Sequence, residues 1–434
     1  MAKEQKIQPK KKNFQAPKGT YDILPQDQAW WEKIYKVTRG IAQAYGFGKI
    51  DTPIIEDAEL FIRATGATTD IVEKQMYTFK TKGGDFLALR PELTPGIVRA
   101  YLQGGLSALP QPVKLYSHGS LFRYERPQAG RYRQHHQINF DIIGSQAPVS
   151  DVQVIQVFFA IFSELGLKNI NLQINSIGCK DCRPAYKKLL TNYYRSKIDK
   201  ICPDCKRRLK ENPLRLLDCK EEKCLQFISS APQIIDHLCE QCHDHFKGVL
   251  EFLDELEIPY MLNPYLVRGL DYYTKTVFEF WPENSDARQA SLGGGGRYDY
   301  LVKMLGGKDT PSIGAGCGIE RLIYQLKFQG VKTPVLPSPR VFFVQLGDLA
   351  KRKSMRLFEE LCQANIFISE SFSKDSIKTQ MKLADRLGAK IVLILGQQEV
   401  LSGTIIVRDM QTGVQETINQ DKLIGELKKR LSKK

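Results

Sequence analysis

LFRYERPQAGRYRQHHQINFD, residues 121–141, concentrates fixed positive charge among aromatic side chains. Its arginines are Arg123, Arg126, Arg131 and Arg133. A solvated surface normally uses flexible lysine balanced by glutamate, whereas the planar guanidinium group of arginine binds phosphate and carboxylate groups through paired hydrogen bonds. The stretch therefore predicts an anion-binding site, built on two strands that are joined by a turn at residues 128–132.

Length and composition bound the classes of protein to which the chain can belong. A chain of 434 residues is too long for one hydrophobic core and predicts two or three domains. No stretch approaches the roughly 18 consecutive apolar residues of a membrane span, and the lysine-rich N-terminus lacks the apolar segment of a secretory signal. We therefore expect a cytoplasmic globular protein with no membrane partner, and a disordered basic tail at residues 1–13.

The net charge of +15 favours a polyanionic partner such as nucleic acid. Many ordinary cytoplasmic proteins are also basic, so charge alone leaves the kind of partner open. Two common nucleotide-binding signatures are missing, because Gly307 and Lys308 are followed by aspartate and the SLGGGG run lacks GxGxxG spacing. These absences argue against a P-loop enzyme and against a Rossmann dehydrogenase.

Hydrophobic periodicity in residues 14–177 and 257–332 predicts one domain with a mixed, mostly antiparallel sheet and flanking helices. Within this domain, the pair Gly83 and Gly84 lies between two alternating runs and predicts a hairpin. Residues 265–281 predict a pair of strands.

Two further segments differ from this pattern. Residues 178–256 predict a cysteine-rich, largely helical insertion into the first domain. A proline-rich linker is expected at residues 333–340. In residues 341–434 strands alternate with amphipathic helices, which predicts a separate α/β domain.

Several arginine-bearing segments lie far apart in the sequence. They are RPELTP with Arg90, Glu92 and Thr94, LVRGLDYYTKT with Arg268, Tyr272 and Tyr273, and GAGCGIERLI with Glu320 and Arg321. Each segment alone has an ordinary structural explanation, such as a surface ion pair, a strand with one buried face, or tight backbone packing. Together they predict one site that holds a triphosphate with side chains rather than with a backbone loop.

These segments resemble the class II aminoacyl-tRNA synthetases, and specifically the histidyl-tRNA synthetase family of the bacterial type. FRYERPQAGRYRQ is similar to the second class motif, GAGCGIERL to the third, and LVRGLDYYTKTVFEF to a block particular to the histidine enzymes. KGTYDILP, RPELTP, GGGRYDYL and ADRLGAKIVLILG also agree, so the resemblance covers nearly the whole chain beyond the first dozen residues. The class motifs alone would leave several amino acids open as substrates.

The resemblance implies a class II catalytic domain of the α+β class, a largely helical insertion and a C-terminal α/β anticodon-binding domain. It also implies a homodimer that uses ATP with Mg²⁺ to convert L-histidine into histidyl-adenylate and pyrophosphate. Histidine would then be transferred to the 3′ end of tRNA(His). The turn at residues 128–132 would approach the acceptor end of the tRNA, and the C-terminal domain would read the anticodon.

By resemblance, three arginines are the catalytic groups. Arg123 would contact the α-phosphate of ATP and the substrate carboxylate, and Arg268 would approach the α-phosphate from the opposite side. Arg321 would hold the γ-phosphate and stack on adenine. Glu125 would lie near the adenine, so that Arg123, Glu125 and Arg321 form the ATP site. Fixed positive charge of this kind stabilises the transition state of an attack at phosphorus.

The resemblance also implies a pocket that selects histidine. Its residues are Glu92, Leu93, Thr94, Arg123, Gln137, Asp141, Arg268, Tyr272 and Tyr273. A carboxylate at Asp141 suits an imidazole N–H as its acceptor, and Gln137 would hold the polar end of the amino acid. His135 stands where the family commonly has an aromatic residue, so we assign it a structural role and no catalytic one.

Eight of the ten cysteines fall within residues 179–242. They form the pairs Cys179/Cys182, Cys202/Cys205, Cys219/Cys224 and Cys239/Cys242. CxxC spacing predicts up to two structural zinc sites, although zinc is not a general property of the family, and reduced buried thiols are the alternative. The sequence leaves open which pairs combine. Because no pair lies in an arginine-bearing segment, we expect zinc to be dispensable for histidyl-adenylate formation.

Two other classes of protein would share parts of this sequence. A catalytically inactive paralogue that serves histidine biosynthesis as a regulatory subunit would lack the anticodon domain and the arginines. An RNA-binding module would not need a histidine pocket. The chain keeps Arg123, Arg268, Arg321 and the C-terminal domain, so we favour the enzyme. Histidine-dependent exchange of pyrophosphate into ATP distinguishes the three classes.

Overall fold

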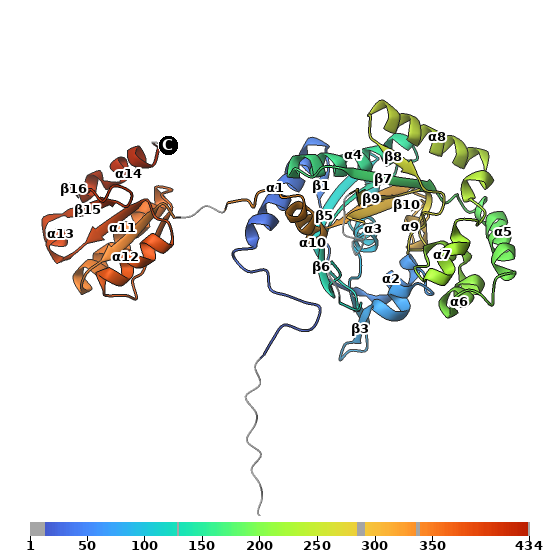
Figure 1. Cartoon of the computed structure of the whole chain (residues 1–434), viewed down its shortest axis with the longest axis horizontal. Helices are drawn as coiled ribbons and strands as arrows, with labels where there is room; N and C mark the ends of the chain where they lie inside the picture. Colours follow the sequence, from blue (N-terminus) through green and yellow to red (C-terminus); the bar gives the residue numbers. More distant parts are fainter. Residues whose placement is uncertain (1–13, 128–129, 284–290, 336–338, 433–434) are drawn as a thin grey trace, which may run out of the picture. The chain divides into compact units, whose positions relative to one another are not determined.

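A computed structural model describes residues 14–127, 130–283, 291–335 and 339–432 (Figure 1). The chain divides into two units, Met1–Pro334 and Val335–Lys434. The basic tail expected at the N-terminus, residues 128 and 129 of the expected turn, and residues 336–338 of the expected linker lie outside the described residues.

An eight-stranded sheet forms the centre of the first unit. In order across the sheet, its strands are β1 (Gly48–Lys49), β5 (Val113–Phe122), β6 (Gln134–Ile143), β11 (Ser312–Gly318), β10 (Gly293–Arg297), β9 (Thr274–Pro282), β7 (Ile170–Ser176) and β8 (Tyr260–Leu262). The outermost neighbours, β1 with β5 and β7 with β8, are parallel, and the other neighbours are antiparallel. This arrangement confirms the mixed, mostly antiparallel sheet predicted from the sequence.

The arginine-rich stretch at residues 121–141 spans the end of β5 and most of β6, which confirms the two predicted strands. Their antiparallel pairing runs from Val113 opposite Ile143 to Phe122 opposite Gln134. The segment between the two strands therefore lies at one end of a ten-residue ladder, where its side chains are held at a fixed edge of the sheet.

The pair of strands predicted for residues 265–281 is wrong. Only β9 forms there, and the residues before Thr274 are turns and loop. Their backbone groups bond outside any strand pair, because Asp271 N donates to Thr65 O at 3.1 Å and Tyr273 O accepts from the side chain of Arg183 in the insertion. Tertiary contacts with neighbouring segments thus replace the hairpin that the alternating pattern indicated.

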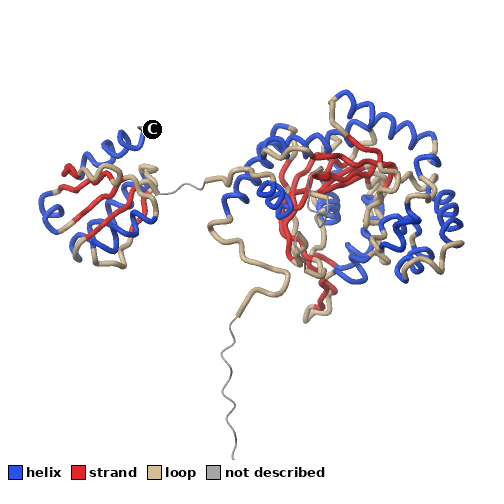
Figure 2. Tube along the Cα trace, viewed as in Figure 1, coloured by secondary structure: helices blue, strands red, loops and turns tan. Residues whose placement is uncertain are grey.

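Helices cover the sheet and close the core of the first unit (Figure 2). They are α1 (Gln28–Ala44), α4 (Pro148–Leu165), α8 (Glu240–Glu255) and α10 (Ile319–Phe328). By length and composition α4 could cross a membrane. However, Phe158, Ile161 and Phe162 are buried against the sheet, as expected for the core helix of a globular domain.

The segment between β1 and β5 forms a smaller antiparallel sheet in the order β2-β4-β3. The predicted hairpin at Gly83 and Gly84 is confirmed, since it joins β3 to β4. The elements of this region and the remaining short helices of the domain are β2 (Ile55–Asp57), β3 (Tyr77–Lys80), β4 (Phe86–Leu89), α2 (Ala58–Thr65), the π-helix η1 (Ile71–Gln75), α3 (Thr94–Gln103), η2 (Leu106–Ala108) and α9 (Leu301–Met304).

The insertion leaves the sheet after β7 and returns to it through α8. As predicted, it is largely helical, with α5 (Arg183–Arg195), α6 (Pro203–Glu211), η3 (Pro213–Asp218), α7 (Glu222–Ile228) and η4 (Ile234–His237) before α8. Its tyrosines Tyr186 and Tyr194 are buried together with four of its cysteines in one hydrophobic cluster that also contains Leu93 and Tyr272, so the insertion shares its core with the rest of the first unit.

The second unit is a five-stranded sheet in the order β13-β12-β14-β15-β16 with helices on both faces (Figure 2). β12 (Val341–Gln345) and β14 (Ile391–Leu395) are buried along their whole length, which is why both read as continuous apolar runs. The other elements are α11 (Asp348–Gln363), β13 (Ile368–Glu370), α12 (Ile377–Arg386), α13 (Gln397–Ser402), β15 (Thr404–Asp409), β16 (Gln415–Asn419), η5 (Gln420–Lys422) and α14 (Leu423–Ser432).

A buried ion cluster joins three elements of the first unit. Arg297 in β10 donates to Asp151 Oδ2 at 2.6 Å and to Asp299 Oδ1 at 3.0 Å. His245 of α8 lies 3.1 Å from the other carboxylate oxygen of Asp151, at the start of α4. All of these side chains are buried, so each depends on its partners for compensation of its charge or polarity.

Replacement of Arg297 by methionine is expected to lower the free energy of unfolding of the first unit by about 3–5 kcal/mol, because Asp151 and Asp299 would lose a buried partner. Arg63→Met is the matched control, since Arg63 forms an exposed i,i+4 pair with Glu59 and its replacement should cost less than about 1 kcal/mol. Urea unfolding followed by circular dichroism measures both. Equal losses in the two variants would contradict the structural role of the cluster.

Candidate active site

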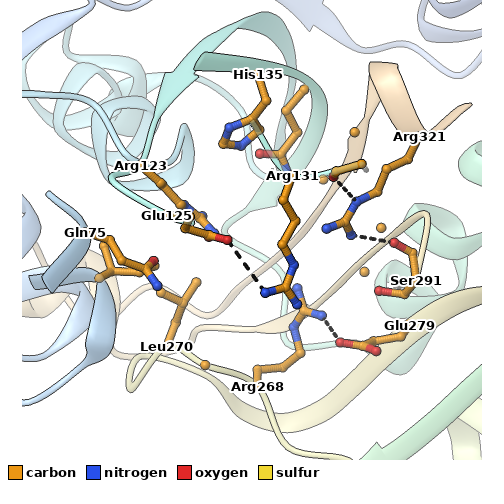
Figure 3. Close-up of a pocket in the computed structure, with 18 of the residues that line it drawn as sticks. Gln75, Arg123, Glu125, Arg131, His135, Arg268, Leu270, Glu279, Ser291 and Arg321 are labelled. Carbon is orange, nitrogen blue, oxygen red and sulfur yellow. Dashed lines mark hydrogen bonds and ion pairs between the residues drawn. The ribbon is translucent and has the colours of Figure 1, made fainter. Parts of the chain in front are cut away.

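A cavity of about 390 Å³ opens beside the central strands of the first unit (Figure 3). Five arginines line it, and they come from separate parts of the chain: Arg123, Arg131, Arg215, Arg268 and Arg321. The wall also contains the carboxylates Glu125, Glu279 and Glu320. The concentration of guanidinium groups around one space suits a ligand that carries several negative charges.

The three arginines predicted to be catalytic all lie in this wall, and each is held by an acceptor of the chain. Arg123 Nε donates to Pro91 O at 2.9 Å. Arg321, in the first turn of α10, donates to Ser291 O at 2.6 Å and to Gly130 O at 3.4 Å. Arg268, just before β9, pairs with Glu279 within that strand. Figure 3 shows these side chains directed from different elements toward the same space.

The other arginines of the opening stretch have different surroundings. Arg131 lies 3.9 Å from Glu125 and lines the cavity. Arg133 stacks its guanidinium group on Tyr124, 3.9 Å from the ring centroid, and Arg126 is exposed. Arg90, from the RPELTP segment, donates to Thr52 O and Ser120 O and so joins strands rather than facing the cavity.

Glycines in β10 and β11 make room for two of the cavity side chains. A Cβ atom at Gly294 would lie 2.9 Å from Arg268 Nη1 and 2.4 Å from Phe278 O. At Gly316 it would lie only 1.7 Å from Gln137 Nε2. Side chains are therefore excluded at both positions, and the glycine-rich runs serve close packing of strands and side chains instead of forming a phosphate loop.

Most of the predicted histidine pocket is buried next to the cavity. Glu92, Thr94, Asp141, Tyr272 and Tyr273 are each at most 7% exposed, whereas Gln137 faces the cavity directly. The Tyr273 ring centroid lies 5.6 Å from the Arg268 guanidinium group, which connects the buried set to the cavity wall.

Leu93 differs from the other predicted pocket residues. Its side chain is part of the hydrophobic core, and its backbone caps α3.

Hydrogen bonds fix the buried polar groups. Tyr272 Oη donates to Glu92 Oε2 at 2.7 Å. Asp141 accepts from Tyr298 Oη at 2.7 Å and from Asn139 Nδ2 at 2.6 Å, with Thr94 Oγ1 at 3.4 Å. Sequence reasoning missed Asn139 and Tyr298 as partners of Asp141, although Asn139 lies in the opening stretch and Tyr298 lies in GGGRYDYL.

Three buried polar atoms of this region have no hydrogen-bond partner among the described residues: Glu92 Oε1, Arg268 Nε and His135 Nδ1. A buried polar atom without a partner costs about 1–3 kcal/mol, so such atoms are rare unless a ligand completes them. An unpaired carboxylate oxygen accepts from a cation, and an unpaired guanidinium N–H donates to an anion. Glu92 Oε1 and Arg268 Nε together therefore suit a zwitterion such as an amino acid.

Comparison with known proteins decides the family. The family model for histidyl-tRNA synthetase matches residues 19–322, and the model for an anticodon-binding domain matches residues 340–430. The histidine–tRNA ligase of Dehalococcoides mccartyi is 47% identical over 418 residues, covering 96% of this chain and 100% of that protein. The chain belongs to the histidyl-tRNA synthetase family. It is therefore an aminoacyl-tRNA ligase with the class II fold predicted from its sequence.

Solved structures agree with this family. The crystal structure of apo histidyl-tRNA synthetase from S. aureus matches at a TM-score of 0.80 and 37% identity, covering 95% of this chain and 99% of that one. A structure described as an ATP phosphoribosyltransferase regulatory subunit/histidyl-tRNA synthetase from Bacillus halodurans C matches at a TM-score of 0.62 and 18% identity, covering 89% of this chain and 99% of that one. At that identity the second match shows the fold alone.

The two adjacent histidines, His135 and His136, have distinct surroundings. Burial, together with the nearby Arg123 and Arg321, lowers the pKa of His135 to about 3, so its imidazole is neutral at physiological pH. His136 is held by Glu320, which lies 2.8 Å from its Nδ1 and accepts its backbone N–H at 2.9 Å. Glu320 also accepts from Tyr21 Oη at 3.1 Å and so fixes the segment before α1.

The insertion supplies part of the cavity wall. Arg215, Asp218 and Lys220 line the same cavity as Arg123 and Arg321. Sequence reasoning missed these residues, because nothing in their local pattern indicates which part of the first domain they approach. The contacts that bring them there are long-range ion pairs, and neither partner is distinctive by itself.

Burial raises the pKa of Glu92 from an ordinary 4.5 to about 7. The folded chain therefore binds the proton more tightly than the unfolded chain, and stability falls as pH rises between these values. Relative to Glu92→Gln, the wild-type free energy of unfolding should fall by about 3 kcal/mol from pH 4.5 to pH 7.5, at about 1.4 kcal/mol per pKa unit. Denaturant unfolding at a series of pH values measures this difference, and a flat difference would contradict the raised pKa.

Proposed function

We propose that the cavity binds ATP and L-histidine together and that Arg123, Arg268 and Arg321 hold the reacting phosphates. The chain is a histidine–tRNA ligase, so the reaction joins histidine to tRNA(His) through histidyl-adenylate. The observation that carries the assignment of residues is the unpaired buried oxygen of Glu92 next to an arginine-lined cavity. A carboxylate in that position suits the ammonium group of an amino acid substrate.

The first step is an attack by the histidine carboxylate on the α-phosphorus of ATP, which releases pyrophosphate. Negative charge on the phosphate oxygens is stabilised by donors that are already in place. Arg268 suits this role because Glu279 fixes one side of its guanidinium group while Nε has no partner among the described residues. Burial, with a further contribution from Arg131, lowers the pKa of Arg321, and a bound polyphosphate would offset this repulsion.

Mg²⁺ fits this site as the ion that accompanies ATP. Carboxylate oxygens of Glu279 and Asp218 line the cavity and belong to the donor class that this cation prefers. Bound to the triphosphate, the ion would neutralise part of its charge. The chain's own arginines remain the groups that orient the α-phosphate.

Histidine would be selected by the buried polar groups beside the cavity. Glu92 would accept the substrate ammonium group, and Gln137 would contact the same polar end from the cavity wall. Asp141 would accept an imidazole N–H. Three donors of the chain already fix its carboxylate, which leaves little room for any other geometry. A pocket with fixed polar partners rejects analogues that lack the matching group, because its own groups would be left unpaired.

The tRNA and the assembly complete the proposal. The acceptor end of tRNA(His) would approach the basic segment at Arg131, and the second unit would bind the anticodon. We further propose a cytoplasmic homodimer that binds no membrane. The domain roles follow the boundaries inferred from the sequence: residues 14–177 and 257–332 for catalysis, 178–256 as the insertion, and 341–434 for the anticodon.

A regulatory paralogue and a simple RNA-binding module are less consistent with the chain. Neither use requires three arginines at one cavity beside a buried carboxylate with an unpaired oxygen. The test is histidine-dependent exchange of pyrophosphate into ATP by the purified protein, with other amino acids as controls. Absence of exchange, with a folded protein and Mg²⁺ present, would contradict the proposed activation reaction.

Arg268→Ala is expected to slow histidyl-adenylate formation by a factor of about 10² to 10³, since one preorganised charge contact contributes about 3–4 kcal/mol to the transition state. ATP binding should weaken far less. Single-turnover adenylate formation and equilibrium ATP binding measure the two effects. Arg63→Ala, an exposed arginine of α2, is the control and should match the wild type. A rate for Arg268→Ala within tenfold of the wild type, with the fold intact, would contradict the role of Arg268.

Truncation after Pro334, where the first unit ends, should largely preserve histidine-dependent pyrophosphate exchange. Aminoacylation of tRNA(His) should fall sharply, because the anticodon contacts would be lost. Exchange and charging assays on the truncated and full-length proteins separate the two steps. Charging at the full-length rate would contradict anticodon binding by the second unit, and loss of exchange would contradict the independence of the first.

A further inference from the structure

The eight cysteines of the insertion gather in two groups of four. The first, named here the neck tetrad, is Cys179, Cys182, Cys239 and Cys242, and the second, the wall tetrad, is Cys202, Cys205, Cys219 and Cys224. Within each tetrad all four sulfur atoms lie within 4.8 Å of one another. The structure thereby selects one of the three pairings that the sequence left open.

We propose that each tetrad binds one structural Zn²⁺ ion. Sulfur atoms about 2.3 Å from a common zinc ion at the corners of a tetrahedron are about 3.8 Å apart. The separations are 3.6 Å for Cys179–Cys182, 3.9 Å for Cys179–Cys239 and 3.8 Å for Cys202–Cys219. A disulfide needs about 2.05 Å, so these sulfurs are not bonded to one another.

Backbone N–H groups are directed at the sulfur atoms of both tetrads. In the wall tetrad, Cys205 N lies 3.3 Å from Cys202 Sγ and Cys202 N lies 3.2 Å from Cys224 Sγ. In the neck tetrad, Cys239 N lies 3.1 Å from Cys182 Sγ. Such donors stabilise thiolate ligands and orient them toward a metal, whereas a packed thiol gains little from them.

The neck tetrad joins the two ends of the insertion. Cys179 and Cys182 follow β7, and Cys239 and Cys242 begin α8, so a metal here would hold the departing and returning chains together. The ends also contact the catalytic strands, because Gly178 O accepts from Lys275 N at 2.9 Å.

The wall tetrad lies next to the active-site cavity. Cys219 stands between Asp218 and Lys220, and both neighbours line the cavity. The same module carries Arg208 and Arg215, which reach Asp70 at 3.1 Å and 2.7 Å. A metal at this tetrad would therefore fix one side of the cavity through the chain on either side of a ligand.

This position changes the expectation that zinc is dispensable for histidyl-adenylate formation. The expectation rested on the separation in sequence between the cysteines and the arginines. In the folded chain the wall tetrad nevertheless lies close to the cavity that the arginines line. The neck tetrad has no residue in the cavity wall among those described, so its loss should affect the attachment of the insertion first.

Zinc is the metal that fits four thiolates in a tetrahedral site without redox chemistry, and its binding stabilises small modules with little apolar surface. The probe is elemental analysis of the full-length protein purified without chelator. We expect two equivalents of zinc per chain in the wild type. Cys182→Ser and Cys205→Ser should each retain one, and Cys362→Ser, which replaces an exposed cysteine outside both tetrads, should retain two.

A second measurement keeps the proposal testable if a serine variant fails to fold. Exchange of the wild-type metal for Co²⁺ should give the intense visible bands of tetrahedral thiolate coordination. Zinc below one equivalent, with all ten thiols reduced and reactive in the native protein, would overturn the proposal in favour of packed thiols. Stoichiometric iron in place of zinc would overturn the identity of the metal.

The expected effect of the wall tetrad on the cavity rests on the proposed function, and it is measured separately from the metal content. Histidine-dependent pyrophosphate exchange should fall about tenfold or more in folded Cys205→Ser, because a displaced wall misplaces ATP. It should remain near the wild-type rate in Cys362→Ser. Unchanged exchange in Cys205→Ser overturns the role of the wall tetrad, even where the metal counts support zinc. Absence of exchange in the wild type counts against the proposed function instead.

Discussion

A buried guanidinium group is costly unless acceptors compensate its N–H groups, and the arrangement of the arginine-lined cavity follows from this cost. Arg123 and Arg321 are held by backbone carbonyl oxygens, and Arg268 is held by the carboxylate of Glu279. Each anchor fixes one part of a guanidinium group and leaves the rest for a ligand. The cavity is thus ready for a polyanion before any ligand arrives, which is the condition for electrostatic stabilisation of a transition state.

The central sheet makes this arrangement possible because two of its strands carry few large side chains. β10 and β11 are built largely of glycine and other small residues, so the side chains of Arg268 and Gln137 lie where Cβ atoms would otherwise stand. At the far end of β10, the side chain of Arg297 is fully buried with Asp151 and Asp299. Strand β10 therefore provides space for a cavity side chain through its glycines and stabilises the fold through the ion pairs of Arg297.

Sequence patterns predicted the elements whose signals are local. The β5–β6 hairpin, the turn at Gly83 and Gly84, and the alternation of strands and helices after Val341 follow from period and turn residues. The segment before Thr274 was predicted wrongly, because Asp271 bonds to Thr65 and Tyr273 bonds to Arg183 of the insertion instead of to a strand. The partners of Asp141, the pairing of the cysteines and the approach of Asp218 to the cavity depend on long-range contacts that no local pattern encodes.

The two cysteine tetrads are nested along the chain, and this has a consequence for the order in which the insertion can form. The wall tetrad is complete once Cys224 has been made, and it joins Cys202 to a residue 22 positions away. The neck tetrad is complete only once Cys242 has been made, and it joins Cys182 to Cys239, 57 positions later. During synthesis from the ribosome, the inner loop is therefore available to close first and at a smaller entropic cost, and the outer loop closes around a part that is already assembled.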